Sequence, residues 1–249
     1  MGVKIERSGA AAIVVLDWQE QRNALGPDEA AEVAAAIRQA GSDPAVCGLV
    51  LTGNGAFCAG GNLKGAVNRS GMPEEQRRQV VYGAFQSLTR SLLDVPVPTV
   101  AAVDGAAVGM GFDMALACDT RFIGPKGWCM QGWGRVGLVP GTGGELMLRL
   151  RAPGLLWRLL ETQERIDGQA AERWNIGESC GDAASARERA VARVNALAPM
   201  SRQALEGYVK LHREALRSQI EAHLGAAVDL QLKLLASPEF KQRVAAVVK

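Results

Sequence analysis

Residues 101–119 read AAVDGAAVGMGFDMALACD, and this stretch decides the fold. An apolar run from Thr99 to Val103 leads into it, with the length and composition of a buried strand. Glycines follow at 105, 109 and 111, and the pattern predicts a helix from about Met110 to Cys118. A strand that ends in glycines and opens a helix is typical of a backbone that closely approaches an anionic ligand, and also of a plain tight turn.

The same arrangement occurs once before in the chain. A strand is expected at Cys47 to Thr52, and residues 53–62 (GNGAFCAGGN) contain four glycines in ten positions. Together the two glycine clusters could form an anion hole. Neither cluster contains a GxGxxG sequence or a Gly-Lys-Ser/Thr sequence. Dinucleotide binding and nucleoside triphosphate hydrolysis therefore lose their main support.

Strands and helices alternate through the first half of the chain, which predicts an α/β core. Further elements expected there are a strand at Ala12 to Asp17, a helix from Pro27 to about Ala40, a helix ending near Leu93 and a strand at Thr120 to Ile123. Beyond Gly144 the pattern turns mostly helical, which predicts a separate layer or an oligomer contact. The helices expected there are 146–150, 155–160, 169–174, 183–197, 201–216 and 220–235.

Composition limits the possible partners. The 249 residues carry 28 Lys plus Arg and 26 Asp plus Glu, a net charge of +2, so no broad basic field exists to hold a nucleic acid or an anionic membrane. Five cysteines without a CxxC pair predict buried free thiols in a reducing cytoplasm. Only two histidines are present, which excludes a His-rich metal site. The first apolar run is too short to span a bilayer, and we expect a soluble protein.

Five segments, in the same order, resemble one known family. Residues 55–64 (GAFCAGGNLK) are similar to the signature A-F-x-A-G-A-D-L-K, and residues 101–119 are similar to A-V-N-G-x-A-x-G-G-G-x-E-L-A-L-A-C-D. Residues 22–25 (RNAL), 136–144 (VGLVPGTGG) and 237–241 (SPEFK) fit the same order. The resemblance is to the crotonase (enoyl-CoA hydratase/isomerase) superfamily, and it covers nearly the whole chain.

This resemblance implies a crotonase-like spiral of ββα units. Residues 1–195 would form the core with the coenzyme A thioester site, and residues 196–249 would form a helical oligomerisation region. The implied assembly is a homotrimer or a hexamer built as a dimer of trimers, and fatty acid metabolism is the implied setting. Coenzyme A would enter as part of an acyl-CoA substrate, with no other cofactor and no metal.

The resemblance also places a site for the thioester. The backbone N–H groups of Gly61 and Met110 would form an oxyanion hole, and Met110 departs from the family's glycine without losing the donor. Residues implied to lie near the coenzyme A are Arg22, Ala24, Ala59, Gly61, Leu63 and Lys64, with Phe240 and Lys241 reaching it from a neighbouring subunit. A structural or solvated role is the alternative for each of the charged and aromatic ones.

Hydratases of this family use two glutamates, and neither is present here. By position, Asp113 stands at the first and Trp133 at the second. Asp113 would serve as the acid/base, and the alternative is an aspartate that favours the first turn of a helix. Trp133 cannot transfer a proton, so with Trp128 it predicts a bulky or cyclic acyl pocket, unless both rings fill the core. Glu145 is a candidate for the missing carboxylate, or another residue placed by a helix dipole.

The remaining polar residues point to no further chemistry. Asp104 and Asp119 match structural positions of the family motif, and His212 and His223 are expected on a solvated helix face. The sequence thus predicts an enoyl-CoA hydratase/isomerase-type enzyme with a single acid/base, which fits double-bond isomerisation better than hydration. The alternatives are a catalytically silent acyl-CoA binder and a C–C bond hydrolase that acts on a cyclic substrate.

Overall fold

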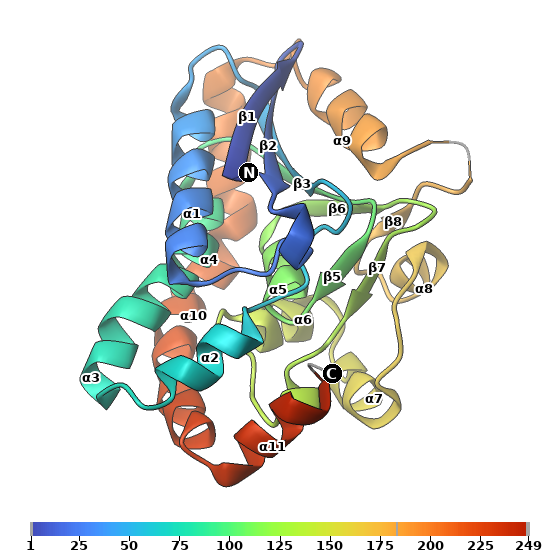
Figure 1. Ribbon diagram of the computed structural model, residues 1–249. Helices are drawn as coiled ribbons and strands as arrows, with labels where there is room; N and C mark the ends of the chain where they lie inside the picture. The colour runs from blue at the N-terminus through green and yellow to red at the C-terminus, as the bar shows by residue number, and fades with distance from the viewer. Residues whose placement is uncertain (1, 183, 248–249) are drawn as a thin grey trace.

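Two β-sheets lie at the centre of the computed structural model, which describes residues 2–182 and 184–247 except for the side chains at 80 and 81 (Figure 1). The larger sheet has the strand order β1-β2-β3-β4-β6-β8, and only the β1–β2 pair is antiparallel. Its strands are β1 (Gly2–Ser8), β2 (Ala11–Asp17), β3 (Gly48–Gly53), β4 (Thr99–Val103), β6 (Thr120–Ile123) and β8 (Glu178–Ser179). A parallel pair, β5 (Ala106–Val108) and β7 (Trp128–Met130), forms the smaller sheet.

Helices surround these sheets and make up most of the second half of the chain. They are α1 (Pro27–Ser42), α2 (Leu63–Arg69), α3 (Glu74–Gln76), α4 (Gly83–Asp94), α5 (Met110–Ala117), α6 (Gly144–Arg151), α7 (Leu155–Thr162), α8 (Gly168–Arg173), α9 (Ala186–Asn195), α10 (Arg202–Leu235) and α11 (Pro238–Val247). Short 3₁₀ turns occur at η1 (Gln19–Gln21) and η3 (Gly134–Val136), and η2 (Arg77–Tyr82) is π-helical.

The predicted α/β class is confirmed, with corrections among the helices. The segments predicted as separate helices at 201–216 and 220–235 form the single helix α10, because no proline interrupts them. The helix predicted at 183–197 begins at Ala186, since the Ser185 side chain accepts a hydrogen bond from Glu188 N and caps it. Position 183 itself lies outside the described residues. The division at residue 195 stays a prediction.

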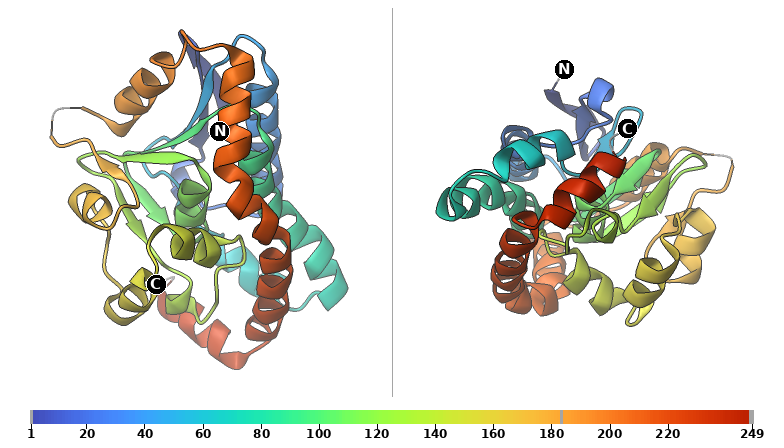
Figure 2. Two further views of the ribbon diagram at one scale, coloured as in Figure 1. Left: turned by 180° about the vertical axis from the view of Figure 1, so that it is seen from behind. Right: turned by 60° about the horizontal axis from the view of Figure 1, so that its bottom comes forward.

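Strands β2, β3 and β4 are buried on both faces, which explains their nearly continuous apolar sequences, whereas the edge strand β1 is largely exposed. Along β2, Ala11, Ile13 and Val15 contact the cluster beneath α9, whereas the alternate residues belong to the main core with α1 and α4. Figures 1 and 2 show α9 on one side of this sheet and α1 and α4 on the other. Because successive side chains of a strand point to opposite faces, alternate residues of β2 pack into the two layers on either side of the sheet.

The two glycine-rich segments lie together because they leave neighbouring parallel strands. Strands β3 and β4 pair with Leu51 opposite Ala101, and the segments follow their carboxyl ends, where α/β folds commonly bind ligands. The Cys58 N–H donates to Ala106 O, and the Val108 N–H donates to Cys58 O, each at 2.9 Å. The loop after β3 is therefore fixed against β5, one residue before α5 begins.

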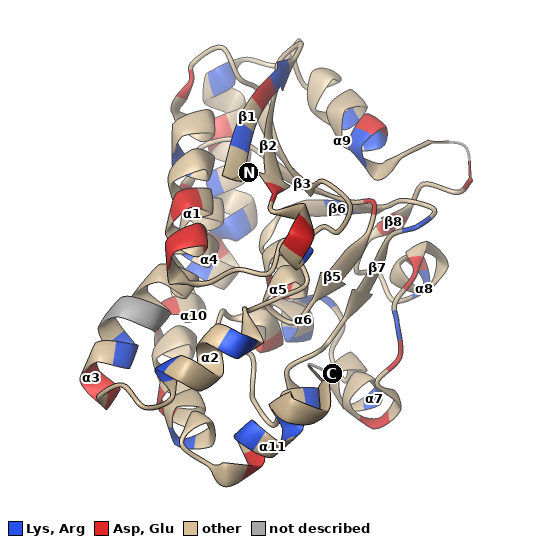
Figure 3. Ribbon diagram, in the orientation of Figure 1, with Lys and Arg blue, Asp and Glu red and all other residues tan. Residues whose placement is uncertain are grey.

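Helix α10 runs along the back of the molecule and carries α11 to the underside (Figure 2). The buried Arg213 of α10 makes two hydrogen bonds to the Asp119 carboxylate, at 2.8 and 2.6 Å, and attaches the helix to the end of α5. Helix α11 then packs against α2 and η3, and Figure 3 shows Lys or Arg residues on both α2 and α11. Among the described residues, no helix is both long and apolar enough to cross a membrane.

Candidate active site

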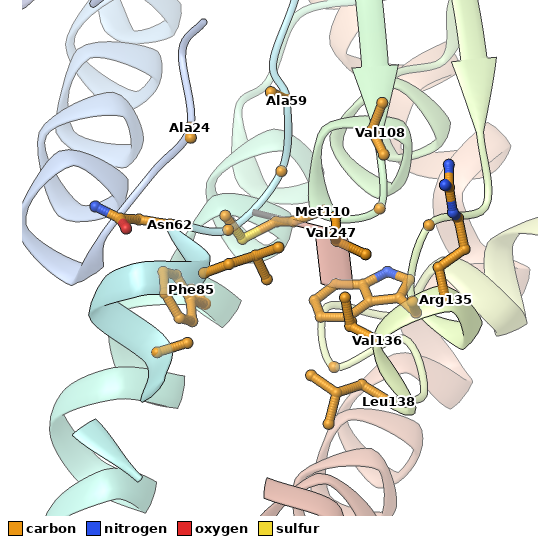
Figure 4. A pocket seen from close by; sticks show the side chains of 18 of the residues that line it. Ala24, Ala59, Asn62, Phe85, Val108, Met110, Arg135, Val136, Leu138 and Val247 are labelled. Atoms are coloured by element: carbon orange, nitrogen blue, oxygen red, sulfur yellow. The ribbon is translucent and has the colours of Figure 1, made fainter. Parts of the chain in front are cut away.

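A cavity of about 750 Å³ opens between the two glycine-rich segments, α2, η2, the loop after β7 and the C-terminal helices. Figure 4 shows Met110, Phe85, Val136 and Leu138 facing this space, with Arg135 at one side. Many of the residues selected from the sequence line it. They are Arg22, Ala24, Ala59, Gly61, Leu63, Lys64, Met110, Trp128 and Trp133.

Two backbone amides at the cavity wall have no partner. No hydrogen bond is made by the N–H of Gly61 or of Met110 among the described residues. The Met110 amide is the first of α5, so it has no acceptor within the helix and lies at the positive end of the helix dipole. A Cβ at Gly60 would lie 2.7 Å from Val108 O and 3.8 Å from Met110 N, which shows how closely the two segments approach. The pair can stabilise a developing oxyanion.

The loop at 22–25 forms the side of the cavity opening. The Leu25 N–H donates to Gly60 O, and the Asn62 N–H donates to Leu25 O. The loop is therefore hydrogen-bonded to the end of the glycine-rich segment 53–62. Arg22 and Asn23 adopt left-handed backbone angles, with φ of 52° and 55°. The buried Asn23 side chain holds this turn by donating to Ala56 O at 2.7 Å. Arg22 and Lys64 are exposed there, where they can meet the phosphates of a ligand.

Asp113 is a buried carboxyl group on the first turn of α5. One of its oxygens, Oδ2, accepts hydrogen bonds from Thr142 Oγ1 at 2.6 Å and from Trp133 Nε1 at 3.1 Å. Burial raises the pKa of Asp113 to about 7, although these two bonds and one from the Gly144 amide oppose the change. A carboxyl with a pKa near 7 is suited to give and take a proton at neutral pH.

Asp113 itself does not line the cavity, which corrects the expectation that its carboxylate faces the ligand directly. Thr142 and Trp133 line it instead and stand between the carboxylate and the open space. The reason is the position of Gly144, where a Cβ would lie only 1.9 Å from Asp113 Oδ1. The carboxylate therefore occupies the space of the missing side chain. Thr142 and Trp133 are thus the cavity-lining residues whose side chains contact the carboxylate.

Glu145 does not supply the second carboxylate, which corrects that expectation too. It is absent from the cavity lining and contacts Arg149 at 3.1 Å and His223 Nδ1 at 3.7 Å, near the outer face of α6 and α10. Successive residues of an α-helix point about 100° apart, so when Gly144 faces Asp113 its neighbour is turned away. Desolvation lowers the pKa of His223, and this histidine does not line the cavity either.

The two tryptophans border the cavity from different elements. The Trp133 indole covers the start of α5, since a Cβ at Gly109 would lie 3.8 Å from its ring. The Trp128 ring is stacked with the Arg165 guanidinium, 4.2 Å from the ring centre. Both are partly buried and both line the open space rather than only filling the core.

The C-terminal helix contributes differently from the expectation. Phe240 is fully buried in a cluster with Val136 and Leu138 of its own chain, so its predicted contact with coenzyme A is replaced by internal packing. Lys241 is exposed and does not line this cavity, and its contact with a neighbouring subunit's ligand stays a prediction. Val247, at the end of α11, does reach the cavity (Figure 4).

Several lining residues were not found from the sequence. Arg69 is the last residue of α2, Arg77 and Tyr82 belong to η2, and Gln231 lies near the C-terminal end of α10. The Tyr82 hydroxyl donates to Gln231 Oε1 at 2.5 Å. The one available signal was the density of arginine in residues 69–78, which is equally typical of a solvated helix. A role for Thr142 at the site could not be predicted, because its place in a glycine-rich turn gives no sign of the direction of its side chain.

The other singled-out residues have structural roles or none at the site. Asp104 accepts hydrogen bonds from the amides of Ala186 and Arg187 and so holds the start of α9. The five cysteines are free thiols, and Cys58, Cys118 and Cys129 are fully buried with pKa values raised by desolvation to about 12. Within residues 2–182 and 184–247, no cluster of three or more His, Cys, Asp or Glu could hold a metal ion.

Comparison with known proteins agrees with this geometry. Residues 6–248 match the family model described as enoyl-CoA hydratase/isomerase. A relative, the probable enoyl-CoA hydratase EchA14 of Mycobacterium tuberculosis, is 34% identical, covering 94% of this chain and 93% of that protein. A carnitinyl-CoA dehydratase of Proteus mirabilis is 32% identical over 80% of this chain and 76% of that protein.

A solved structure shares the fold over its full length. The crystal structure of an enoyl-CoA hydratase from Bacillus halodurans superposes with a TM-score of 0.90 at 22% identity, covering 99% of this chain and all of that one. Because the family model spans nearly all residues and the relatives cover most of both chains, the chain belongs to the enoyl-CoA hydratase/isomerase family of acyl-CoA-processing enzymes.

Proposed function

We propose that this enzyme binds an acyl-CoA thioester, forms its enolate and moves a double bond along the acyl chain. The observation that carries the proposal is the pair of unpartnered amides, Gly61 and Met110, beside a buried carboxyl whose pKa is near 7. The amides would hold the thioester oxygen as it gains negative charge. A preorganised donor of this kind typically lowers the barrier by about 3 kcal/mol.

A proton shuttle through Thr142 completes the proposal. The C2 proton of a 3-enoyl-CoA passes to Thr142 Oγ1 while the hydroxyl proton moves to Asp113 Oδ2, and the electron pair of the broken C–H bond moves into the enolate. Reversal of the same transfers returns a proton at C4 and leaves the 2-enoyl-CoA. The 2.6 Å bond between Thr142 and Asp113 supports this route. One carboxyl suffices because the same proton leaves and returns.

Apart from the exposed Glu20, the described cavity lining contains no carboxylate that could act together with Asp113 behind it, which favours isomerisation over hydration. Water addition in the family's usual manner needs two acid/base groups, and Trp133 occupies the place of the second. Its indole N–H instead donates to Asp113. A tryptophan at that position supports a dry, apolar site around the reacting carbons, where electrostatic interactions are strengthened.

The decisive experiment follows a 3-enoyl-CoA and crotonyl-CoA by product analysis. We expect isomerisation of the first, little hydration of the second, and a loss of about 100-fold or more in isomerisation for both Asp113→Asn and Thr142→Val. Thr142→Ser, which keeps the hydroxyl, should retain most activity. Glu145→Gln is the matched control, because this carboxylate lies outside the cavity and its removal should leave the rate unchanged.

Each of the other possible outcomes supports a different mechanism or function. If Thr142→Val is as active as the wild type but Asp113→Asn is not, the carboxylate acts directly and the shuttle is wrong. If crotonyl-CoA is hydrated efficiently, the reaction is a hydration. If neither substrate reacts although acyl-CoA stabilises the protein against heat, the chain is a silent binder and the proposal fails.

We further propose that the chain assembles as a trimer or a dimer of trimers, with the ββα units forming the spiral expected for the family. Four large apolar side chains support an interface in the second half of the chain. They are Trp157 on α7 and Tyr208, Leu211 and Leu230 on α10, each more than half exposed in the single chain. The free cysteines support a cytoplasmic location. Light scattering after size exclusion would give the subunit number.

A further inference from the structure

Arg77 is a buried cation without a partner inside the cavity. Its residue is only 7% exposed, and it lines the cavity from the π-helical segment η2. Neither Nε nor Nη1 has a hydrogen-bond acceptor, and no ion pair of Arg77 occurs among the described residues. Neighbouring Arg78 differs, since it is paired with Glu74 and, at 2.7 Å, with Asp229.

An arrangement of this kind is costly in the absence of a ligand. A guanidinium that loses water without gaining an acceptor destabilises the folded protein. Buried arginines in proteins are therefore paired with carboxylates or phosphates, often through two parallel hydrogen bonds. Arg77 lines the cavity, and its buried Nε and Nη1 groups have no acceptor among the described residues, which together point to an anionic group that belongs to the ligand.

The surroundings of Arg77 strengthen this reading. Arg69, whose Nε also lacks a partner, lines the same cavity, and the positive charges of both arginines oppose the rise that burial causes in the pKa of the Tyr82 hydroxyl. The Tyr82 hydroxyl donates a hydrogen bond to Gln231 Oε1, and Gln231 Nε2 donates one to the Val139 carbonyl, so both side chains already have partners. Glu20 is the single acidic residue found in the cavity lining of the described chain, and it is exposed at the surface. No protein carboxylate therefore competes for Arg77 in the cavity.

The position of Arg77 distinguishes its ligand from the phosphates of coenzyme A. The cations at the opening, Arg22 and Lys64, are exposed, whereas Arg77 is a buried residue of η2, which packs against α4 and α10. Coenzyme A phosphates are strongly hydrated and favour an exposed binding surface. With the thioester oxygen at Gly61 and Met110 as proposed, the far end of the acyl chain would enter the buried region, whose lining includes Phe85 and Leu235.

On the basis of the proposed function, we infer that the acyl group carries a second, terminal carboxylate, which Arg77 binds with the support of Arg69. The substrate class is thus an ω-carboxyacyl-CoA, the monothioester of a dicarboxylic acid, rather than a simple fatty acyl-CoA. Charge-assisted hydrogen bonds of this kind are stronger than neutral ones and give selectivity through the guanidinium's fixed geometry.

Binding of non-reacting esters tests this inference without depending on catalysis. Dissociation constants are measured by titration calorimetry for succinyl-, glutaryl- and adipoyl-CoA and for butyryl-, pentanoyl- and hexanoyl-CoA. At one or more chain lengths, the carboxylated ester should bind at least 10-fold more tightly than its apolar counterpart. Arg77→Met should remove that preference while leaving the binding of the apolar esters within about 3-fold.

Two further variants keep the test decisive. Arg78→Met is the matched control, since this partly exposed arginine is one residue away and already paired, and it should keep the full preference. Arg77→Lys keeps the charge but not the fork geometry, and should retain part of the preference even if Arg77→Met folds poorly.

The contrary results are distinct. Equal affinity for carboxylated and apolar esters at every length would overturn the inference, as would a preference that survives in Arg77→Met. A similar loss of affinity for all esters in Arg77→Met would assign Arg77 to coenzyme A and overturn it as well. If the preference is present but no substrate reacts, the inference holds and the proposed reaction fails.

Discussion

Gly144 and Asp113 share one space: a Cβ at position 144 would lie 1.9 Å from Asp113 Oδ1 and 2.3 Å from its carboxyl carbon. The glycine amide also opposes the rise that burial causes in the pKa of this carboxyl. The first residue of α6 therefore determines where the carboxyl of α5 lies, and with it the positions of Thr142 and Trp133.

Gly144→Ala should displace the Asp113 carboxylate and lower kcat by about 100-fold, since a shift of about 1 Å has effects of that size. Overpacking should also destabilise the fold by about 1–3 kcal/mol. Gly225→Ala is the control, because its Cβ would meet nothing and alanine favours the helix by up to about 1 kcal/mol. A Gly144→Ala enzyme with normal kcat would show that the carboxyl position is unimportant for catalysis.

The stability of the protein should depend on pH through Asp113. The folded state keeps this carboxyl protonated up to pH 7, whereas the unfolded chain releases the proton near pH 4. Its contribution is therefore full below about pH 4 and is lost as the pH rises through 7, by at most about 4 kcal/mol. Compared with Asp113→Asn, the wild type should lose free energy of unfolding between pH 5 and pH 8 in denaturant titrations. Parallel pH profiles of the two proteins would contradict the raised pKa.

The Met110 amide can be removed with little change to the helix. Met110 is the first residue of α5, a position where proline is well tolerated. Met110→Pro eliminates the N–H donor, whereas Met110→Ala shortens the side chain and keeps the donor. We expect kcat to be about 100- to 1000-fold lower in the proline variant than in the alanine variant. Equal rates would exclude this amide from the oxyanion hole.

The Arg213–Asp119 pair should be important for stability. Arg213 is 3% exposed and also donates to the carbonyls of Leu93, Val95 and Val97. Arg213→Met leaves a buried carboxylate uncompensated and should cost about 3–5 kcal/mol of unfolding free energy in denaturant titrations. Arg217→Met, one helical turn away, removes an exposed pair with Asp94 and should cost less than about 1 kcal/mol. Equal losses would show that burial of the pair is not the cause.

The sequence was sufficient to predict the main elements that hold the site. The apolar runs before the two glycine clusters predicted β3 and β4, and the helix expected from Met110 begins at that residue. These features are local, since strand alternation and glycine spacing can be read over about ten residues. Strands β5, β7 and β8 were missed because two or three residues are too few to show a period, and the edge strand β1 was missed because it is largely polar and exposed.

The direction of side chains could not be predicted in the same way. Asp113 faces Gly144 and Glu145 points outward, and both depend on how α5 packs against α6. Arg77 lies in a polar interval that is typical of a solvated surface, and its burial results from the packing of η2 against α4 and α10. Tertiary contacts decide such cases, and they are not encoded within any single segment.

We propose as the central claim that this enzyme removes a C2 proton from the acyl-CoA to form a thioester enolate, and that Asp113 is the final acceptor of the proton. Exchange of the C2 hydrogens of a saturated acyl-CoA with D₂O, followed by mass spectrometry, tests it most directly because no double bond or second proton donor is needed. The wild type should incorporate deuterium, with a rate that rises with pH through about 7 as Asp113 loses its proton. Asp113→Asn should exchange at least about 100-fold more slowly. Equal exchange in the two proteins, or none in the wild type with the ester bound, would contradict the claim.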